Sequence, residues 1–220
     1  MNRSYRKHRS TASILLIITA IAVAVLIAAA AFIYFAGIRY IRYNYEDGYV
    51  KYFGRVDENG DPLSGTLVYE SGVRAKVNLE KSEIVYSNGD LYDGPLKDLR
   101  RHGEGKLIYA GGDVYEGSFA EDKIDGYGRY TYANGDVYEG RWSEDIMNGE
   151  GILRLANGMK YRGGFLNGEE HGNGVAVDAD GTRYEGTFEE GQRHGKFIIK
   201  DASGNIVREC VYSLGKISNK

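Results

Sequence analysis

The sequence predicts an all-β protein: an elongated, single-layer antiparallel β-meander of 23-residue hairpin repeats, preceded by one transmembrane α-helix. Three observations lead to this expectation: an uncharged apolar segment near the N-terminus, a phrase that recurs at a constant interval, and an unusual composition. The 220 residues include 31 glycines and 19 tyrosines but only 2 prolines. Glycine without proline is typical of many tight turns between strands, and tyrosine is typical of half-buried strands.

The chain begins with a short basic tail, residues 1–11, and its charge is unevenly distributed. Residues 1–48 hold six basic and two acidic residues, which leaves 22 of the 28 basic and 29 of the 31 acidic residues in 49–220. The body of the protein is therefore acidic, with a formal charge of −7. An acidic body is a poor electrostatic match for nucleic acid and for anionic lipid headgroups, so we expect neither as a partner.

The apolar segment predicts a transmembrane helix at residues 12–38. From Thr11 to Ile38 there is no charged residue. A 25-residue helix starting at Ile14 would be roughly 37 Å long, more than the ~30 Å hydrocarbon core of a bilayer. A cleaved signal peptide is the alternative, because the four alanines at 28–31 offer small residues to a peptidase. The anchor is favoured, since the apolar run is longer than a signal core of about 7–15 residues and continues past these alanines.

The charges on either side of this helix predict its orientation. The short tail is rich in Arg and Lys, whereas the other side has Arg39 and Arg42 followed by acidic residues. Because positively charged flanks stay in the cytoplasm, we expect a cytoplasmic N-terminus and an extracytoplasmic repeat domain. Residues 39–48 are expected to be a juxtamembrane linker whose tyrosines lie at the membrane interface.

A stripe of small residues is a candidate helix-packing face. Ala20, Ala24 and Ala28 lie four residues apart and therefore on one face of the helix. Small residues at this spacing let two transmembrane helices approach closely. The alternative is that alanine is simply frequent in this segment.

The repeat is defined by one recurring phrase. It is ANGDVYEG at 133–140, and its copies are SNGDLYDG (87–94), AGGDVYEG (110–117), ANGMKYRG (156–163) and ADGTRYEG (179–186). The interval is always 23 residues, and each unit has Tyr at position 4, Gly at positions 6 and 15, a large apolar residue at position 8 and Ala at position 22. This agreement predicts five repeats over 89–203. Degenerate copies are expected at 49–88, and a terminal cap strand and tail at 204–220, because outer units of stacked repeats face solvent.

Alternation within one unit predicts two short strands joined by a longer loop. Tyr138, Gly140 and Trp142 alternate with more polar residues, which is the period of a strand. The loop is expected to contain Gly149 and Gly151.

Between units we expect a three-residue loop with a glycine bulge at 134–136. This loop would place Tyr138 opposite Tyr132 and Gly140 opposite Tyr130, with all the rings on one face. Glycine at position 6 would leave room for a neighbouring ring to lie over the backbone.

The YEG…GxG…NG unit with its 23-residue period resembles the MORN (membrane occupation and recognition nexus) repeat. The units at 112–134 and 135–157 fit that pattern at nearly every position. The resemblance is strong over 89–203 and weak over 49–88. It implies a twisted antiparallel meander, a scaffold role that often involves dimerisation and, for some repeats of this kind, phosphoinositide binding, which the acidic array disfavours. Asp178, Asp201 and Phe197 depart from the pattern and make the last two units irregular.

Candidate chemical sites are few, and we expect no catalytic residue, no metal site and no cofactor. His102, His171 and His194 share position 14 of their units. Neighbouring copies should lie about 10 Å apart, too far to share one ion with bonds of ~2 Å, so these are expected to be polar loop residues. The calcium-like stretches at 57–61 and 178–181 lack the glutamate that completes such a loop, and they lie where turns are expected.

The aromatic face is the remaining candidate site. Its residues are Tyr92, Tyr115, Phe119, Tyr138, Trp142, Tyr161, Phe165, Tyr184 and Phe188. They either form the core of the sheet or contact a partner, since aromatic residues often dominate binding surfaces.

We therefore expect a non-catalytic, membrane-anchored scaffold for protein–protein interaction or self-association. Its expected location is the cell (inner) membrane of a bacterial envelope. The alternative is a lipid- or small-ligand-binding module that uses the aromatic face.

Overall fold

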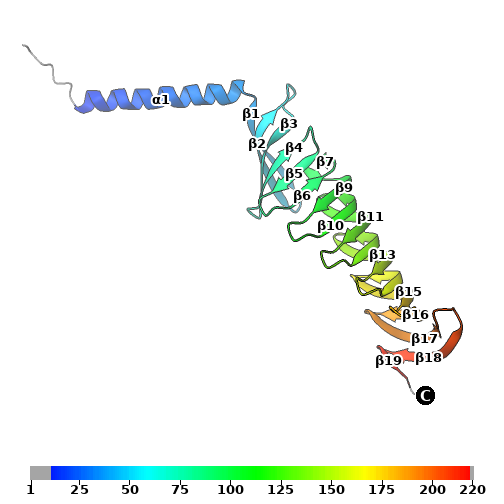
Figure 1. Ribbon diagram of the computed structural model, residues 1–220. Helices are drawn as coiled ribbons and strands as arrows, with labels where there is room; N and C mark the ends of the chain where they lie inside the picture. Colours follow the sequence, from blue (N-terminus) through cyan, green and yellow to red (C-terminus); the bar gives the residue numbers. More distant parts are fainter. Residues whose placement is uncertain (1–10, 219–220) are drawn as a thin grey trace, which may run out of the picture.

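The computed structural model describes residues 11–218, so residues 1–10 of the predicted basic tail lie outside the described part. A single helix, α1 (Thr11–Phe35), projects away from one end of a long rod of strands (Figure 1). Every side chain from Leu15 to Phe35 is exposed. By length and composition this helix fits either a membrane anchor or a signal sequence.

Nineteen strands follow the helix. They are β1 (Ile38–Tyr45), β2 (Gly48–Val56), β3 (Pro62–Tyr69), β4 (Arg74–Asn78), β5 (Glu83–Tyr86), β6 (Leu91–Asp93), β7 (Leu96–Lys97), β8 (Arg100–Arg101), β9 (Gly103–Ile108), β10 (Val114–Ala120), β11 (Lys123–Thr131), β12 (Val137–Ser143), β13 (Ile146–Arg154), β14 (Lys160–Leu166), β15 (Glu169–Val177), β16 (Arg183–Glu189), β17 (Gln192–Lys200), β18 (Ile206–Ser213) and β19 (Lys216–Ile217).

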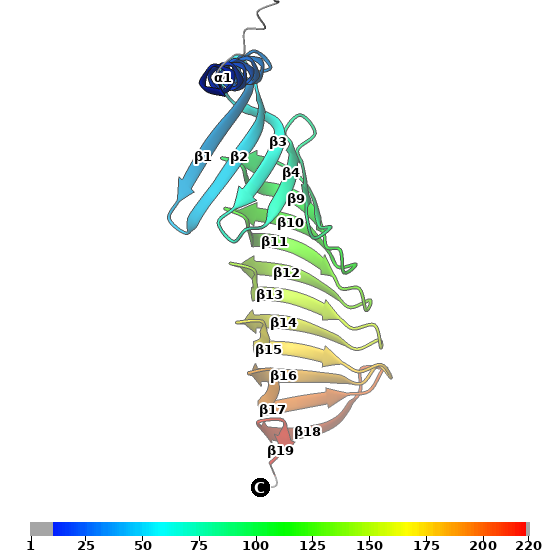
Figure 2. The same cartoon turned by 90° about the vertical axis from the view of Figure 1, so that its left-hand side faces the viewer.

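Seventeen of these strands form one antiparallel sheet, stacked like rungs along the rod (Figure 2). Each strand pairs with its neighbour in chain order, except that β6 pairs with β9 while β7 and β8 form a separate pair. The interruption follows Pro95, which has no N–H to donate to a ladder. The predicted all-β meander preceded by one helix is confirmed.

The turn within each unit is tighter than expected. β12 and β13 are joined by Glu144 and Asp145 alone, with φ of 49° and 68°. Two successive positive φ values are typical of a type I′ hairpin turn. The predicted long loop is therefore wrong: Gly149 and Gly151 lie inside β13.

These internal glycines belong to a β-bulge. The pairing register shifts between Gly140↔Gly151 and Trp142↔Met147, so Arg141 lies opposite a three-residue stretch that includes Gly149, whose φ is +97°. Corresponding shifts occur in the hairpins β10–β11, β14–β15 and β16–β17. Because a bulge bends its strand, these four hairpins bend at the same place, and a single sheet can bury one of its own faces.

The loop between units is of the predicted kind but lies one residue earlier. Tyr132 N–H donates to Asp136 O at 2.9 Å, which encloses a three-residue loop that ends at Gly135 with φ +93°. Tyr138 therefore lies opposite Tyr130, rather than the predicted Tyr132, and Gly140 lies opposite Gly128. A register change of two residues keeps every side chain on its face, so the rings still share one face.

The segment 39–48, expected to be a linker, belongs almost entirely to the sheet. β1 pairs with β2 from Ile38↔Arg55 to Tyr45↔Gly48. This segment forms a strand because every second residue faces inward: Ile41, Tyr43 and Tyr45 pack against the core. Only Ala36 and Gly37 separate α1 from β1. Tyr43 and Tyr45 therefore pack against the core of the sheet and do not form an aromatic belt at the membrane interface.

Candidate interaction surface

A row of glycines crosses the sheet beneath the tyrosine rings. Gly128, Gly140 and Gly151 face one another across neighbouring strands. A Cβ on Gly151 would lie 2.5 Å from Tyr138 Oη and 2.7 Å from its Cε2. Tyr138 Oη donates to the carbonyl of Arg141 at 2.9 Å. The predicted role of the position-6 glycine is confirmed, and the position-17 glycine of the next strand shares it.

The rings form one continuous chain of edge-to-face contacts along the rod. Neighbouring ring centroids lie 4.9–5.8 Å apart in the order Tyr92, Phe119, Tyr115, Trp142, Tyr138, Phe165, Tyr161, Phe188, Phe197 and Tyr212. Each such contact contributes about 0.5–1.5 kcal/mol beyond the burial of its area. The chain therefore couples each repeat to the next.

Burial corrects the expectation that the aromatic face is open to a partner. Of the nine predicted residues, all except Tyr184 are at most 8% exposed. Their side chains are occupied by contacts with one another, so they offer no accessible contact surface. The structure uses them as core, which is the other interpretation that the sequence left open.

The departure of the last repeat from the pattern has a local explanation. Phe197 stands where the other repeats have glycine, and its ring takes the place that a tyrosine ring has elsewhere, 2.6 Å from a Cβ built on Gly186. Tyr184 is displaced and stays half-buried. The guanidinium of Arg193 lies 3.6 Å from the centroid of the Tyr184 ring, which stabilises its new position.

The hairpin tips form a second ladder that the sequence reasoning missed. Asp145 N–H donates to Ile124 O at 2.9 Å, and Ile124 N–H donates to Asp145 Oδ1 at 2.8 Å. The same backbone bond joins Asp122 to Arg101, Gly168 to Met147, Gly191 to Glu170 and Gly215 to Arg193. The signal was present in four of the five units, where position 11 is Asp or Gly, residues that tolerate positive φ; the first unit has Leu99 there, with φ 63°.

The loops between units also stack on one another. Asp113 Oδ1 accepts the N–H of Ala133 in the following loop at 2.8 Å. A Cβ on Gly112 would lie 3.3 Å from the Cβ of Ala133. A larger residue at position 22 would therefore collide with the preceding loop, which explains the recurring alanine.

The repeated part of the chain matches a known family. The family model described as MORN repeat matches residues 100–114, 115–137, 138–160, 161–183 and 184–196. Residues 100–196 are MORN repeats. The MORN array begins within the first predicted unit, and the helix and β1–β7 precede it.

Two solved structures show only distant similarity to the whole chain. One is the SAS-4 (dCPAP) TCP domain in complex with a proline-rich motif of Ana2 (dSTIL) of Drosophila melanogaster, at 17% identity over 83% of this chain and 90% of that chain, with a TM-score of 0.41. The other is a streptogramin B lyase, at 14% identity over 82% and 70%, with a TM-score of 0.18. TM-scores this low carry no argument about function. No curated protein matches the chain.

The outer face of the MORN array carries charges of both signs, and some of them form ion pairs. Lys106 contacts Glu116 at 2.7 Å, and Arg154 contacts Glu139 at 3.3 Å, in each case across neighbouring strands. Tyr127 is 57% exposed on this face and donates to Glu139 at 3.2 Å. This mixed surface is the accessible side of the array.

The histidines do not form a cluster. His102 lies between β8 and β9, whereas His171 lies in β15 and His194 in β17, both at bulges. Within residues 11–218, no group of three or more His, Cys, Asp or Glu side chains could hold a metal ion. In the calcium-like stretch, Asp57 Oδ1 accepts the N–H groups of Asn59 and Asp61 at 2.9 Å, which is an ordinary turn.

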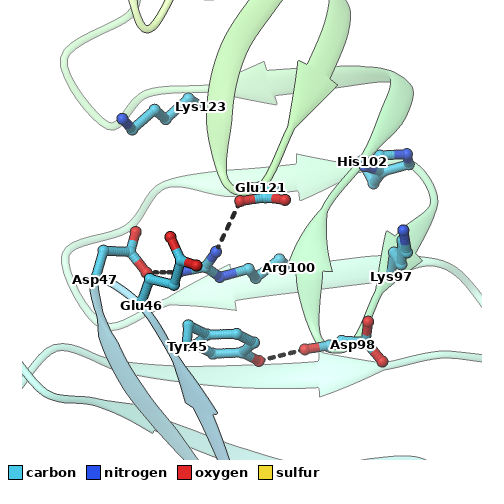
Figure 3. Close-up of a pocket in the computed structure, with 9 residues that line it drawn as sticks. All are labelled: Tyr45, Glu46, Asp47, Lys97, Asp98, Arg100, His102, Glu121 and Lys123. Atoms are coloured by element: carbon cyan, nitrogen blue, oxygen red, sulfur yellow. Dashed lines mark hydrogen bonds and ion pairs between the residues drawn. The ribbon is translucent and has the colours of Figure 1, made fainter.

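A cluster of charged side chains lies where the β1–β2 turn meets the hairpin tips (Figure 3). Arg100 lies 3.8 Å from the centroid of the Tyr45 ring, pairs with Asp47 and contacts Glu121 at 3.5 Å. The hydrogen bond from Arg100 lowers the pKa of Asp47, and burial raises the pKa of Tyr45 to about 12. These contacts hold the N-terminal hairpin against the array, so we assign the cluster to structure.

The small-residue stripe of α1 stays a prediction. Ala20, Ala24 and Ala28 are exposed, as is every side chain of the helix from residue 15 onward.

Proposed function

We propose that this protein is a non-catalytic, membrane-anchored scaffold that presents a rigid MORN array for protein–protein interaction. One observation carries the proposal: the aromatic rings are used in internal packing, so the array supports its own shape and leaves its outer face free. MORN repeats are generally non-catalytic. The alternative of a ligand-binding aromatic face is disfavoured because those rings are buried.

The anchor in this proposal is α1. An apolar helix that is exposed on all sides is unfavourable in water and stable in a bilayer, where its backbone groups are satisfied internally. The basic tail favours a cytoplasmic N-terminus, which places the sheet on the extracytoplasmic side of the inner membrane. The membrane segment would end before Ile38, where β1 begins.

The contact surface in this proposal is the outer face of the array around Tyr127. This side chain is the most exposed aromatic residue of the array. Tyrosine combines a large apolar area with a polar tip and is frequent in binding hot spots. Paired charges beside it would favour partners of complementary pattern.

Crosslinking and affinity purification of the full-length protein from its native membrane tests the scaffold. We expect a co-purifying protein, or a second copy, that is lost in Tyr127→Ala and kept in the control Ile206→Ala, an exposed residue of the terminal strand. Recovery of the same partner with both variants would remove Tyr127 from the contact. Release of the protein by alkaline carbonate would contradict the anchor.

A further inference from the structure

The outer face of β1–β5 differs in charge from the outer face of the MORN array. We call it the proximal face. Five of its outward side chains are basic: Arg42, Lys51, Arg55, Arg74 and Lys76. Carboxylates lie at its margins: Glu70 and Glu83, and Asp57, Glu58 and Asp61 in the loop between β2 and β3. The opposite side of the same strands is buried, so this face is the accessible one.

The basic side chains of the proximal face are not neutralised by neighbours. In the described part of the chain, none of the five lies within ion-pair distance of a carboxylate. On the array, Lys106 pairs with Glu116, and Arg129 lies opposite Glu116 and Glu139 in the strand register. Arg42 instead lies 4.0 Å from the centroid of the Tyr49 ring, and Lys51 lies 5.1 Å from it. The face therefore presents positive charge to whatever lies against it.

Exposed apolar side chains lie among these charges. Tyr40 is 61% exposed and Phe53, its partner across β1 and β2, is 53% exposed. Beside Phe53 a hollow of about 560 Å³ is lined by Val68 and Val85 and flanked by Arg74 and Lys76. Aromatic and basic residues together suit the boundary between headgroups and acyl chains.

The proximal face points to the side from which α1 projects. Figure 2 views the molecule from that side: α1 is seen nearly end-on, and β1–β4 lie in front of the array. Figure 1 agrees, since β1 and β2 run from the end of the helix across its axis. The connection is short, and Gly37 O accepts the N–H of Val56 at 2.9 Å. A bilayer that contains α1 would therefore meet this face.

We propose that the proximal face lies on the anionic headgroups of the same bilayer that α1 spans. This inference rests on the proposed anchor. It concerns strands that precede the matched MORN repeats. The expectation that anionic lipid is disfavoured came from the total charge of 49–220, but the structure gathers unpaired basic residues on one face, next to the membrane.

Lipid proximity of a label on the proximal face tests the proposal in the full-length protein. Thr66, in the middle of the face, is replaced by Cys in a Cys210→Ser background and labelled with a fluorophore. The protein is reconstituted in phosphatidylcholine bilayers with and without phosphatidylglycerol, each containing a headgroup-nitroxide lipid. We expect stronger quenching of the label in the anionic bilayers than in the neutral ones, and we expect this excess to be lost at high salt, where charges are screened.

A matched pair of variants separates this face from charge in general. Lys51→Gln, Arg74→Gln and Lys76→Gln together should abolish the excess quenching in anionic bilayers. Arg129→Gln, Arg162→Gln and Lys196→Gln remove the same charge from exposed positions of the array and should leave it unchanged. A second label at Ile198→Cys, at the far end of the sheet, should not be quenched.

The outcomes distinguish the two proposals. If the protein resists alkaline carbonate in both bilayers but the Thr66→Cys label shows no excess quenching in the anionic bilayers, the anchor stands and lipid docking is overturned. If spin labels at this position broaden one another instead, a second copy covers the face, which also overturns it. If the protein leaves both bilayers, the anchor fails, and the docking proposal fails with it.

Discussion

The recurring tyrosine and glycine of the repeat work as one unit at the scale of the residue. The ring of Tyr138 lies over Gly140 and Gly151, and its hydroxyl reaches the backbone of Arg141. The sequence could predict that glycine makes room for a ring, because the two residues recur in fixed register. It could not predict that the Phe197 ring would fill the space over Gly186, since this depends on whether the ring of Phe197 or that of Tyr184 occupies it.

Substitution of Gly151 tests this packing. Gly151→Ala should lower the free energy of unfolding by about 1–3 kcal/mol, the usual cost of overpacking, because its Cβ would meet the Tyr138 ring. Gly111→Ala is the control, since nothing lies within 4 Å of the added Cβ. Denaturant titration should show the control unchanged or slightly stabilised. Equal effects of the two substitutions would refute the role of the ring.

Glu170 should make stability depend on pH. Burial raises its pKa to about 7 from an ordinary value of 4.5, and the charge of Arg193 opposes the shift. The folded state therefore binds the proton more tightly than the unfolded state. The contribution of Glu170 to stability should be greatest below about pH 4.5 and should be lost as the pH rises through about 7.

Thermal unfolding between pH 4.5 and 8 checks this dependence for Glu170. Glu170→Gln should flatten the profile over this range, whereas Glu169→Gln, an exposed neighbour, should leave it as it is. A profile that is the same in both variants would exclude Glu170 as its source.

Turns decide how well each element could be predicted. The loops between units contain Gly135 and its equivalents, so their kind was recognised. The hairpin tips of the central repeats are Glu-Asp pairs with positive φ, which is uncommon for residues with a Cβ, so the glycines of the bulge were mistaken for the loop. Their conformation depends on hydrogen bonds to the preceding repeat, which no local pattern displays.

Substitution of Asp145 at one hairpin tip separates two contributions to stability: the hydrogen bond of its side chain and the tolerance of its positive φ. Asp145→Ala loses both the acceptor for Ile124 N–H and the tolerance of a φ of 68°. Asp145→Gly loses only the acceptor. We expect the alanine variant to be less stable than the glycine variant by about 1 kcal/mol, the cost of left-handed backbone for a residue with a Cβ. Denaturant titration of both measures it, and a more stable alanine variant would contradict the assigned strain.

At the scale of the whole molecule, the period predicted the meander, and composition predicted the helix. The linker expectation failed because residues 39–48 were judged by their position next to the helix, although Ile41, Tyr43 and Tyr45 alternate as in a strand. The burial of the aromatic face depends on bulges repeated in four successive hairpins, and this follows only from the assembled sheet. The positive charge of the proximal face could not be predicted either, because only the assembled sheet brings its basic residues together.

Removal of one complete repeat tests this architecture. Deletion of residues 138–160 joins Val137 to Tyr161 in register and brings Tyr115 next to Phe165. Since each repeat contacts only its neighbours, the full-length variant should stay folded and become shorter by about 10 Å, two strand spacings. Circular dichroism and small-angle scattering measure both. Loss of the β signal would show that the repeats are not interchangeable.

The short connection between α1 and the sheet has a mechanical consequence. The connection consists of Ala36 and Gly37 alone, and Gly37 is hydrogen-bonded to Val56, so the helix and the sheet have little freedom to move independently. When the helix rotates about its long axis, the rod rotates with it as one rigid body. The far end of the rod then moves along an arc around the helix axis. A molecule bound near the C-terminal strands would therefore move along this arc instead of diffusing freely on a flexible linker.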